Sequence, residues 1–172
     1  MPVSINNGYV MRAWYDISDT PIRREDEAGV RAAQHSVEAL LTREKSRGIA
    51  ANRIVLAGFS QGGAIALQTG LRHTERLAGI MALSTYVPLA DKLATEANPA
   101  NRGIPIFMAH GTADPMIPIA RGKESRDLLL RQGYAPEWSE YRMEHSVCPQ
   151  ELADIVEWLR RVLHGCNADP GL

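Results

Sequence analysis

The feature that most constrains this chain is a short apolar run that ends in a glycine-rich turn around a serine. Residues 54–57 are apolar, residues 58–63 read Gly-Phe-Ser-Gln-Gly-Gly, and residues 64–68 favour a helix. Strand, Gly-x-Ser-x-Gly and helix in this order are typical of a nucleophile elbow, with the serine, Ser60, at the tip of a tight turn. The flanking glycines have no side chain, and any side chain there would clash where the strand and the helix approach each other. An ordinary glycine-rich turn is the other interpretation.

A nucleophilic serine needs a base, and the base needs an acid that orients it. In this kind of fold they follow in the order serine, acid, histidine, and the chain offers that order. Residues 104–111 are typical of a buried strand that Asp114 follows, and residues 138–143 alternate like a strand that His145 follows. Because open α/β sheets place their sites at the carboxyl ends of strands, we expect Ser60, Asp114 and His145 to lie together. The N–H of Gln61, at the start of the helix, is predicted to bind an oxyanion.

The other histidines fit the role of base less well. His35 and His73 lie in or at the end of helical stretches, and His164 is near the C-terminus. We expect all three on the surface, where most histidines of this kind are solvated. His110 precedes a turn, and we interpret it as a hydrogen-bonded structural histidine that lines the site from below.

Helical stretches that alternate with apolar strands predict an α/β fold. We expect helices at 26–47, 119–132 and 150–163, further strands at 77–84 and 104–109, and a short helix with a loop over 89–101. The first seventeen or so residues are expected to form an extended loop, and residues 165–172 a frayed end. With 172 residues, the chain is long enough for a single domain, residues 1–172, with a core of its own.

Composition and charge argue against several kinds of partner. The formal net charge of −1 gives no electrostatic reason to expect nucleic acid or an anionic membrane. No apolar run reaches the roughly 18 residues of a transmembrane helix, and the first residues do not resemble a signal peptide. Cys148 and Cys166 are expected to be free thiols in a reducing compartment, so we predict a cytoplasmic protein. No cluster of ligating residues has metal spacing, and we expect neither a metal nor another cofactor.

Several motifs in order resemble the bacterial carboxylesterase and acyl-protein thioesterase group of the α/β-hydrolases. They are residues 14–16, 57–64, 82–88, 110–114 and 141–145, and the resemblance runs from about residue 2 to about residue 163. It implies a three-layer, mostly parallel sheet with helices on both faces. It also implies Ser60 as nucleophile, Asp114 as acid and His145 as base in the cleavage of esters with short to medium acyl chains. Acyl-protein thioesterase or lysophospholipase activity is the nearest alternative.

The chain departs from the family pattern in two places. Glu144 stands where the family usually has a glycine before its histidine. The family also begins with strands, a helix and a His-Gly-x-Gly-type loop that this chain lacks, and that loop carries half of the oxyanion hole. Without it we expect weak activity, and a nearly inactive dimeric interaction module is the alternative of another class. The strand at 53–57 would be an apolar edge, which we expect the N-terminal segment or a second copy, in a homodimer, to cover.

An acyl substrate needs an apolar groove beside the nucleophile. Tyr86 and Val87 follow one strand end, and Met116 and Ile117 follow the acid, so the resemblance supports both loops as acyl contacts. Ordinary loop packing is the alternative for these four residues. Trp14 either anchors the core or forms a wall of the pocket.

Overall fold

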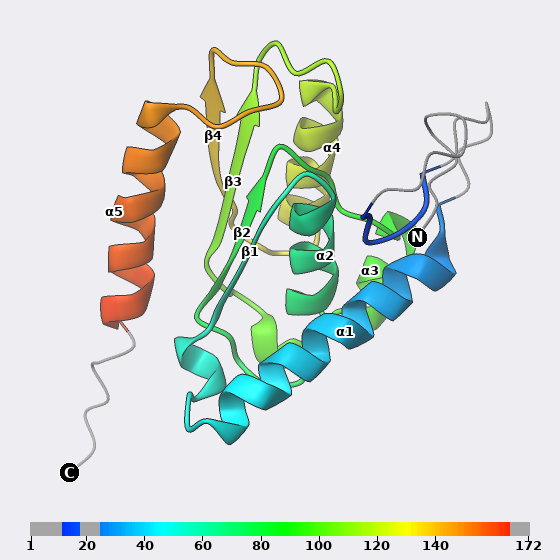
Figure 1. Cartoon of the computed structure of the whole chain (residues 1–172), viewed down its shortest axis with the longest axis vertical. Helices are drawn as coiled ribbons and strands as arrows, with labels where there is room; N and C mark the ends of the chain where they lie inside the picture. Colours follow the sequence, from blue (N-terminus) through cyan, green and yellow to red (C-terminus); the bar gives the residue numbers. More distant parts are fainter. Residues whose placement is uncertain (1–11, 18–24, 166–172) are drawn as a thin grey trace.

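Four short strands pair in chain order to form one parallel sheet. The computed structural model describes residues 12–17 and 25–165, and within them the sheet has the order β1-β2-β3-β4 (Figure 1). Every neighbouring pair is parallel. The strands are β1 Val55–Phe59, β2 Gly79–Leu83, β3 Ile106–Gly111 and β4 Glu137–Tyr141.

Helices connect the strands and cover both faces of the sheet, as parallel pairing requires. The helices are α1 Glu27–Ser46, α2 Gln61–Gly70, α3 Leu93–Glu96, α4 Ile119–Arg131 and α5 Pro149–Gly165. Short 3-10 turns occupy Ala51–Arg53, Ala90–Lys92 and Pro99–Asn101. Figure 1 shows α1, α2 and α4 on one face and α5 on the other. The predicted α/β-hydrolase-like fold class is confirmed.

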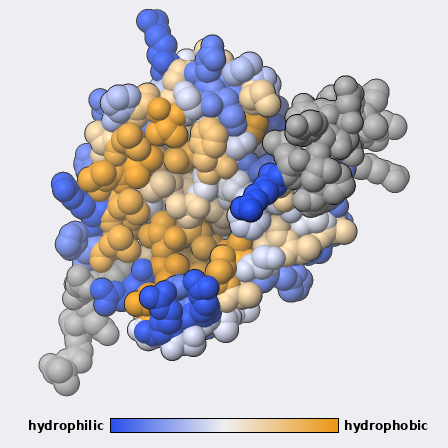
Figure 2. Space-filling model, viewed as in Figure 1, coloured by the Kyte–Doolittle hydropathy of each residue, from blue (hydrophilic) through white to orange (hydrophobic). Residues whose placement is uncertain are grey.

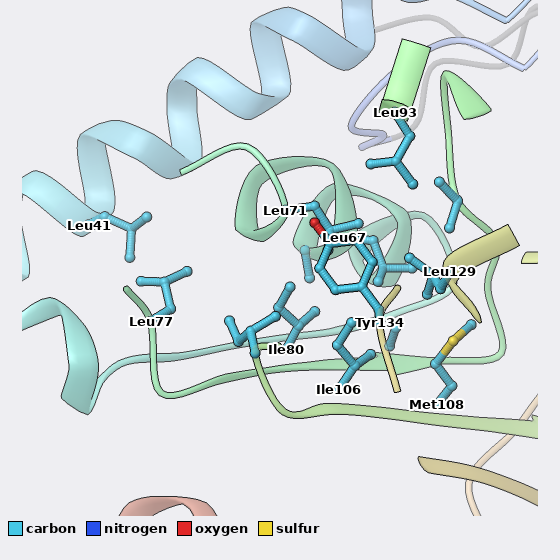
Figure 3. Close-up of a cluster of buried hydrophobic side chains, with 14 of the residues drawn as sticks. Leu41, Leu67, Leu71, Leu77, Ile80, Leu93, Ile106, Met108, Leu129 and Tyr134 are labelled. Carbon is cyan, nitrogen blue, oxygen red and sulfur yellow. The ribbon is translucent and has the colours of Figure 1, made fainter. Parts of the chain in front are cut away.

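The two faces of the sheet bury alternate residues of the central strands. Ile80 and Ile106 pack toward α1, α2 and α4, in a cluster with Leu67, Leu71 and Leu129 (Figure 3). Their neighbours Met81 and Phe107 pack on the opposite face, with Trp158 of α5. Successive side chains of a strand point to opposite faces, and β2 and β3 are buried along their whole length because both faces are covered.

The strand before the predicted nucleophile is far less buried than its neighbours. Ala57 and Phe59 are exposed, whereas β2 and β3 are buried throughout. Within the described residues, β1 pairs only with β2. The N–H of Ser60 donates to Leu83 and the carbonyl of Ile54 accepts from Ala78, so the alternate residues 55, 57 and 59 direct their backbone groups to the free edge. Among the residues that the structure describes, the elbow strand is therefore an apolar edge strand.

Some expectations concern segments that the structure does not describe. The predicted loop over residues 1–11, its role in covering the edge, and the end of the chain from residue 166 lie outside the described residues. Among the helices that are described, none combines the length and the apolar character that crossing a bilayer requires.

Candidate active site

Ser60 occupies the strained turn that the elbow motif predicts. Its backbone has φ 54° and ψ −124°, a conformation that costs a non-glycine residue roughly 1–3 kcal/mol. Two contacts hold it in place. The N–H of Ser60 donates to the Leu83 carbonyl at 2.9 Å, and the Thr85 hydroxyl donates to the Ser60 carbonyl at 2.6 Å. Both partners lie at the end of β2 or directly after it, so the sheet itself fixes the turn.

Two glycines of the motif, Gly58 and Gly62, lie with their backbones close together. A Cβ on Gly58 would lie 2.1 Å from the carbonyl carbon of Gly62, closer than any real contact, so residue 58 must lack a side chain. A Cβ on Gly62 would instead meet Trp14 Nε1 at 3.6 Å, an ordinary van der Waals distance. The predicted clash of a side chain is thus confirmed at Gly58, and the same prediction is wrong at Gly62. The second glycine contributes through its backbone, which lies directly against Gly58.

Asp114 and His145, which are 31 positions apart, are hydrogen-bonded in the structure. His145 Nδ1 lies 2.7 Å from Asp114 Oδ2. The other carboxylate oxygen, Oδ1, accepts from the N–H groups of Met116 and Ile117, both at 2.9 Å. The Asp114 side chain is fully buried, and that of His145 is 18% exposed.

The protonation state of Asp114 follows from these contacts. Burial alone would raise the pKa of Asp114, but the hydrogen bonds with His145, Ile117 and Met116 outweigh it, and the pKa lies below its ordinary value. The carboxylate is therefore ionised at neutral pH and can only accept hydrogen bonds. It follows that Nδ1 of His145 carries a proton. In the neutral ring, Nε2 is left with a lone pair that can accept another proton.

A close approach of two loops brings the acid to the histidine. A Cβ on Gly111, at the end of β3, would lie 2.3 Å from the Glu144 carbonyl oxygen, so only glycine lets the histidine loop cross there. Two backbone bonds join the loops further. Thr112 donates to Tyr141 at 2.8 Å, and Ala113 donates to Met143 at 3.1 Å.

The histidine loop also lies against the elbow. The rings of Phe59 and His145 are 4.6 Å apart between centroids, with 47° between their planes. Since Phe59 directly precedes Ser60, the structure brings the three predicted catalytic residues to one region at the carboxyl ends of the strands. Glu144, where the family usually has a glycine, is exposed.

The other histidines divide into buried and exposed ones. His110 is buried, and its Nε2 lies 2.8 Å from the Ile117 carbonyl, which agrees with the structural role predicted for it. His35 and His164 are exposed, as expected. The prediction for His73 is wrong: it is 5% exposed, with Nδ1 2.7 Å from Glu38 Oε2 of α1.

The predicted acyl contacts occupy different environments. Tyr86 is buried, with Arg121 packed over its ring at 3.3 Å from the centroid. Val87 and Ile117 are buried in the core clusters, which favours a role in core packing over a role in acyl contact for these two residues. Met116 is 67% exposed.

A pocket of about 730 Å³ lies beside α4, and Tyr86 and Val87 belong to its lining. Neither Ser60 nor His145 lines this pocket. Within the described residues, no group of three or more histidines, cysteines and acids is placed to hold a metal ion.

The segment around Trp14 meets the elbow through contacts that the sequence analysis missed. Trp14 is 43% exposed, so its interpretation as a core anchor is wrong, and the neighbouring Tyr15, 2% exposed, is buried instead. The side chain of Gln61 bonds to the backbone of both residues. The sequence indicates a role only for the backbone N–H of Gln61, because a side-chain contact across 46 positions leaves no local pattern.

Comparisons with known proteins extend over almost the whole chain. Residues 1–163 match the family model described as phospholipase/carboxylesterase. Acyl-protein thioesterase 1 of Gibberella zeae is 41% identical over 172 residues, which cover 95% of this chain and 73% of that protein. Acyl-protein thioesterase 1 of Neurospora crassa is 43% identical over 169 residues, which cover 92% of this chain and 69% of that protein.

Solved structures also resemble this chain over almost its whole length. The crystal structure of Arabidopsis thaliana SOBER1 superposes with a TM-score of 0.88 at 31% identity, over 94% of this chain and 79% of that one. Zea mays acyl-protein thioesterase 2 superposes with a TM-score of 0.83 at 27% identity, over 94% and 77% of the two chains. The fold, the elbow and the extent of these matches show that the chain belongs to the phospholipase/carboxylesterase family of ester-bond hydrolases.

Proposed function

We propose that the protein cleaves carboxylic esters of short to medium acyl chains through an acyl-enzyme, with Ser60 as nucleophile, His145 as base and Asp114 as orienting acid. The observation that carries the proposal is the partly buried Asp114–His145 hydrogen bond beside a serine in a strained elbow. A serine, a histidine and a carboxylate so arranged are the parts that nucleophilic acyl transfer requires.

Each step follows from the state of these groups. His145 Nε2 accepts the Ser60 proton as the serine oxygen attacks the ester carbonyl. The proton then passes to the leaving alcohol as the carbon–oxygen bond breaks, and the acyl group stays on Ser60. Water then gives a proton to His145 as its oxygen attacks the acyl carbon, and His145 passes that proton to the Ser60 oxygen as the bond between Ser60 and the acyl group breaks. Asp114 stabilises the imidazolium that forms in both steps.

We further propose that the Gln61 N–H binds the oxyanion of the tetrahedral intermediate. It lies at the N-terminus of α2, where unpaired N–H groups and the helix dipole favour negative charge. Removing a donor of this kind costs about a hundred- to a thousandfold in rate.

Substitution of the nucleophile tests the proposal. Ser60→Ala should abolish hydrolysis of p-nitrophenyl butyrate. Ser36→Ala, on the exposed surface of α1, is the matched control and should keep the parent rate. A Ser60→Ala variant as fast as the parent would rule out Ser60 as nucleophile.

The relatives favour a second substrate class. Because chains up to 43% identical are acyl-protein thioesterases, thioester cleavage by the same residues is the strongest alternative. Comparison of kcat/KM for an S-acylated peptide and the matched O-acyl ester decides between them, and a lysophospholipid tests lysophospholipase activity in the same assay. A thioester preference of more than about tenfold would replace the carboxylesterase assignment.

A further proposal is that two copies associate through the edge of β1, which has no strand paired to it within the described residues. Exposed apolar side chains occur on β1, on α5 and in the loop before α5; they are Phe59, Val147, Leu152, Val156 and Leu163. Figure 2 shows apolar residues gathered on the side where α5 and β1 lie. Identical edges related by a twofold axis pair antiparallel, and the net charge of −1 gives two copies little mutual repulsion.

Light scattering after size-exclusion chromatography tests this association. We expect twice the chain mass of 18.9 kDa. Val156→Lys should give the single-chain mass, whereas Leu40→Lys, an equally exposed apolar position on α1, should not. A monomeric parent would refute the dimer. A dimer without any hydrolysis would instead favour an interaction module.

We also propose that the protein acts in the cytoplasm, because Cys148 is a free thiol and a reducing compartment keeps thiols free. Fractionation of the source cells tests this, and recovery outside the cytoplasmic fraction would refute it.

A further inference from the structure

Gln61 uses its side chain to hold the segment before α1. Its carboxamide oxygen accepts from the Trp14 N–H at 3.1 Å, and its carboxamide nitrogen donates to the Tyr15 carbonyl at 3.0 Å. One side chain thus binds a donor and an acceptor on two consecutive residues. Only an amide side chain offers both functions side by side.

Residues 14–16, called the strap below, have two further attachments. The Tyr15 hydroxyl is hydrogen-bonded to the Tyr86 hydroxyl at 2.7 Å in a buried position. The N–H of Asp16 donates to Asp26 Oδ2 at 2.9 Å. The strap is therefore fixed to α2, to the loop after β2 and to the residue that caps α1.

The strap places the Trp14 indole at the elbow. Its Nε1 lies 3.6 Å from the position of a Cβ on Gly62, two residues after Ser60. The side chain is 43% exposed, so one part of the ring contacts the first turn of α2 and another part faces solvent. A large, rigid apolar surface beside a nucleophile is suited to an acyl chain.

We propose that the Gln61 side chain is a positioning residue that holds Trp14 as a wall of the acyl site, and that this wall sets the preference for acyl-chain length. This inference rests on the proposed function. Gln61 then acts in two ways, since its N–H binds the oxyanion while its carboxamide fixes the wall relative to Ser60. Chain-length preference and oxyanion geometry depend on the same residue.

Gln61→Met separates the two roles. Methionine has the same length and keeps the backbone N–H, but it makes neither hydrogen bond to the strap. We expect the ratio of the KM for p-nitrophenyl octanoate to the KM for the acetate to rise about tenfold, the effect of losing the burial of roughly two methylenes. Trp14→Ala should have the same effect, and the double variant should be no worse than either one because both remove the same wall.

Gln68→Met is the matched control. Gln68 lies on the same helix, and its side chain bonds to Gln34 of α1 rather than to the strap. We expect it to leave the ratio of octanoate to acetate KM unchanged. An effect of Gln68→Met equal to that of Gln61→Met would show a general response of α2 and would overturn the inference.

Amide exchange followed by ¹⁵N NMR gives a readout that needs no hydrolysis. The Trp14 N–H should exchange faster in Gln61→Met, because it loses its acceptor, and should be unchanged in Gln68→Met. Unchanged exchange in Gln61→Met overturns the positioning role, and faster exchange with an unchanged KM ratio overturns the role in chain-length preference. A parent protein that hydrolyses none of the esters overturns the proposed function instead.

Discussion

Asp114→Asn tests the electrostatic arrangement of the site with the smallest possible change in shape. The asparagine carbonyl can keep the two hydrogen bonds from the Met116 and Ile117 N–H groups. Its NH₂ group then faces His145 Nδ1, in place of the carboxylate oxygen that lies 2.7 Å away. The ring must accept at Nδ1, so its proton moves to Nε2. The lone pair that takes the Ser60 proton is thereby lost.

The expected loss is large because the tautomer of the base is wrong. Replacing the orienting aspartate of a serine–histidine–aspartate triad by asparagine costs about ten-thousandfold in kcat, or about 5.5 kcal/mol at 1.36 kcal/mol per factor of ten. The melting temperature should fall by less than about 4 °C, because the backbone contacts remain and that shift corresponds to about 1 kcal/mol in a chain of this size.

The assay is kcat for p-nitrophenyl butyrate, with a thermal melt of each variant. Asp127→Asn, an exposed acid of α4 paired with Arg126, is the control and should keep the parent rate. An Asp114→Asn variant that stays folded and retains more than about a tenth of the parent rate would refute the role of Asp114.

Two further substitutions test the packing. Gly58→Ala places a Cβ 2.1 Å from the Gly62 carbonyl carbon and should lower the free energy of unfolding by more than about 3 kcal/mol, whereas Gly103→Ala, at φ +70° with open space around it, should cost about 1 kcal/mol in the same denaturant titration. Burial raises the pKa of the Glu151 carboxyl above 4.5, so its ionised form costs stability as the pH rises from the unfolded-state value through the raised folded-state value. Glu151→Met should therefore raise the melting temperature more at about pH 8 than at about pH 4, and the exposed Glu157→Met should show no such trend; equal shifts at both pH values would contradict this.

The orientation of the strands was predictable because the pattern of residues carries it. Residues 79–83 and 106–109 contain no polar side chain and show no alternation, which is typical of strands covered on both faces, and the connections contain helices. The elbow was equally clear, since its glycines are required by backbone contacts between near neighbours in sequence. A strand end followed by Asp114 and another followed by His145 placed both residues at the same edge of the sheet.

Side-chain contacts between distant segments were not predictable. His73 ends a helical stretch, a position typical of solvated residues, yet it is buried because the end of α2 packs against Glu38 of α1. The two bonds from Gln61 to residues 14 and 15 depend on where the strap crosses α2. Neither contact leaves a periodic signal, since each depends on how two elements meet in space.

Covalent capture of the nucleophile tests the central claim most directly. The protein is incubated with a fluorophosphonate, and the adduct is counted by intact mass and located by peptide mapping. We predict one adduct per chain, on Ser60, forming much more slowly in Asp114→Asn. An unmodified chain, or an adduct on another residue, would contradict the assignment of Ser60 as a nucleophile activated by His145.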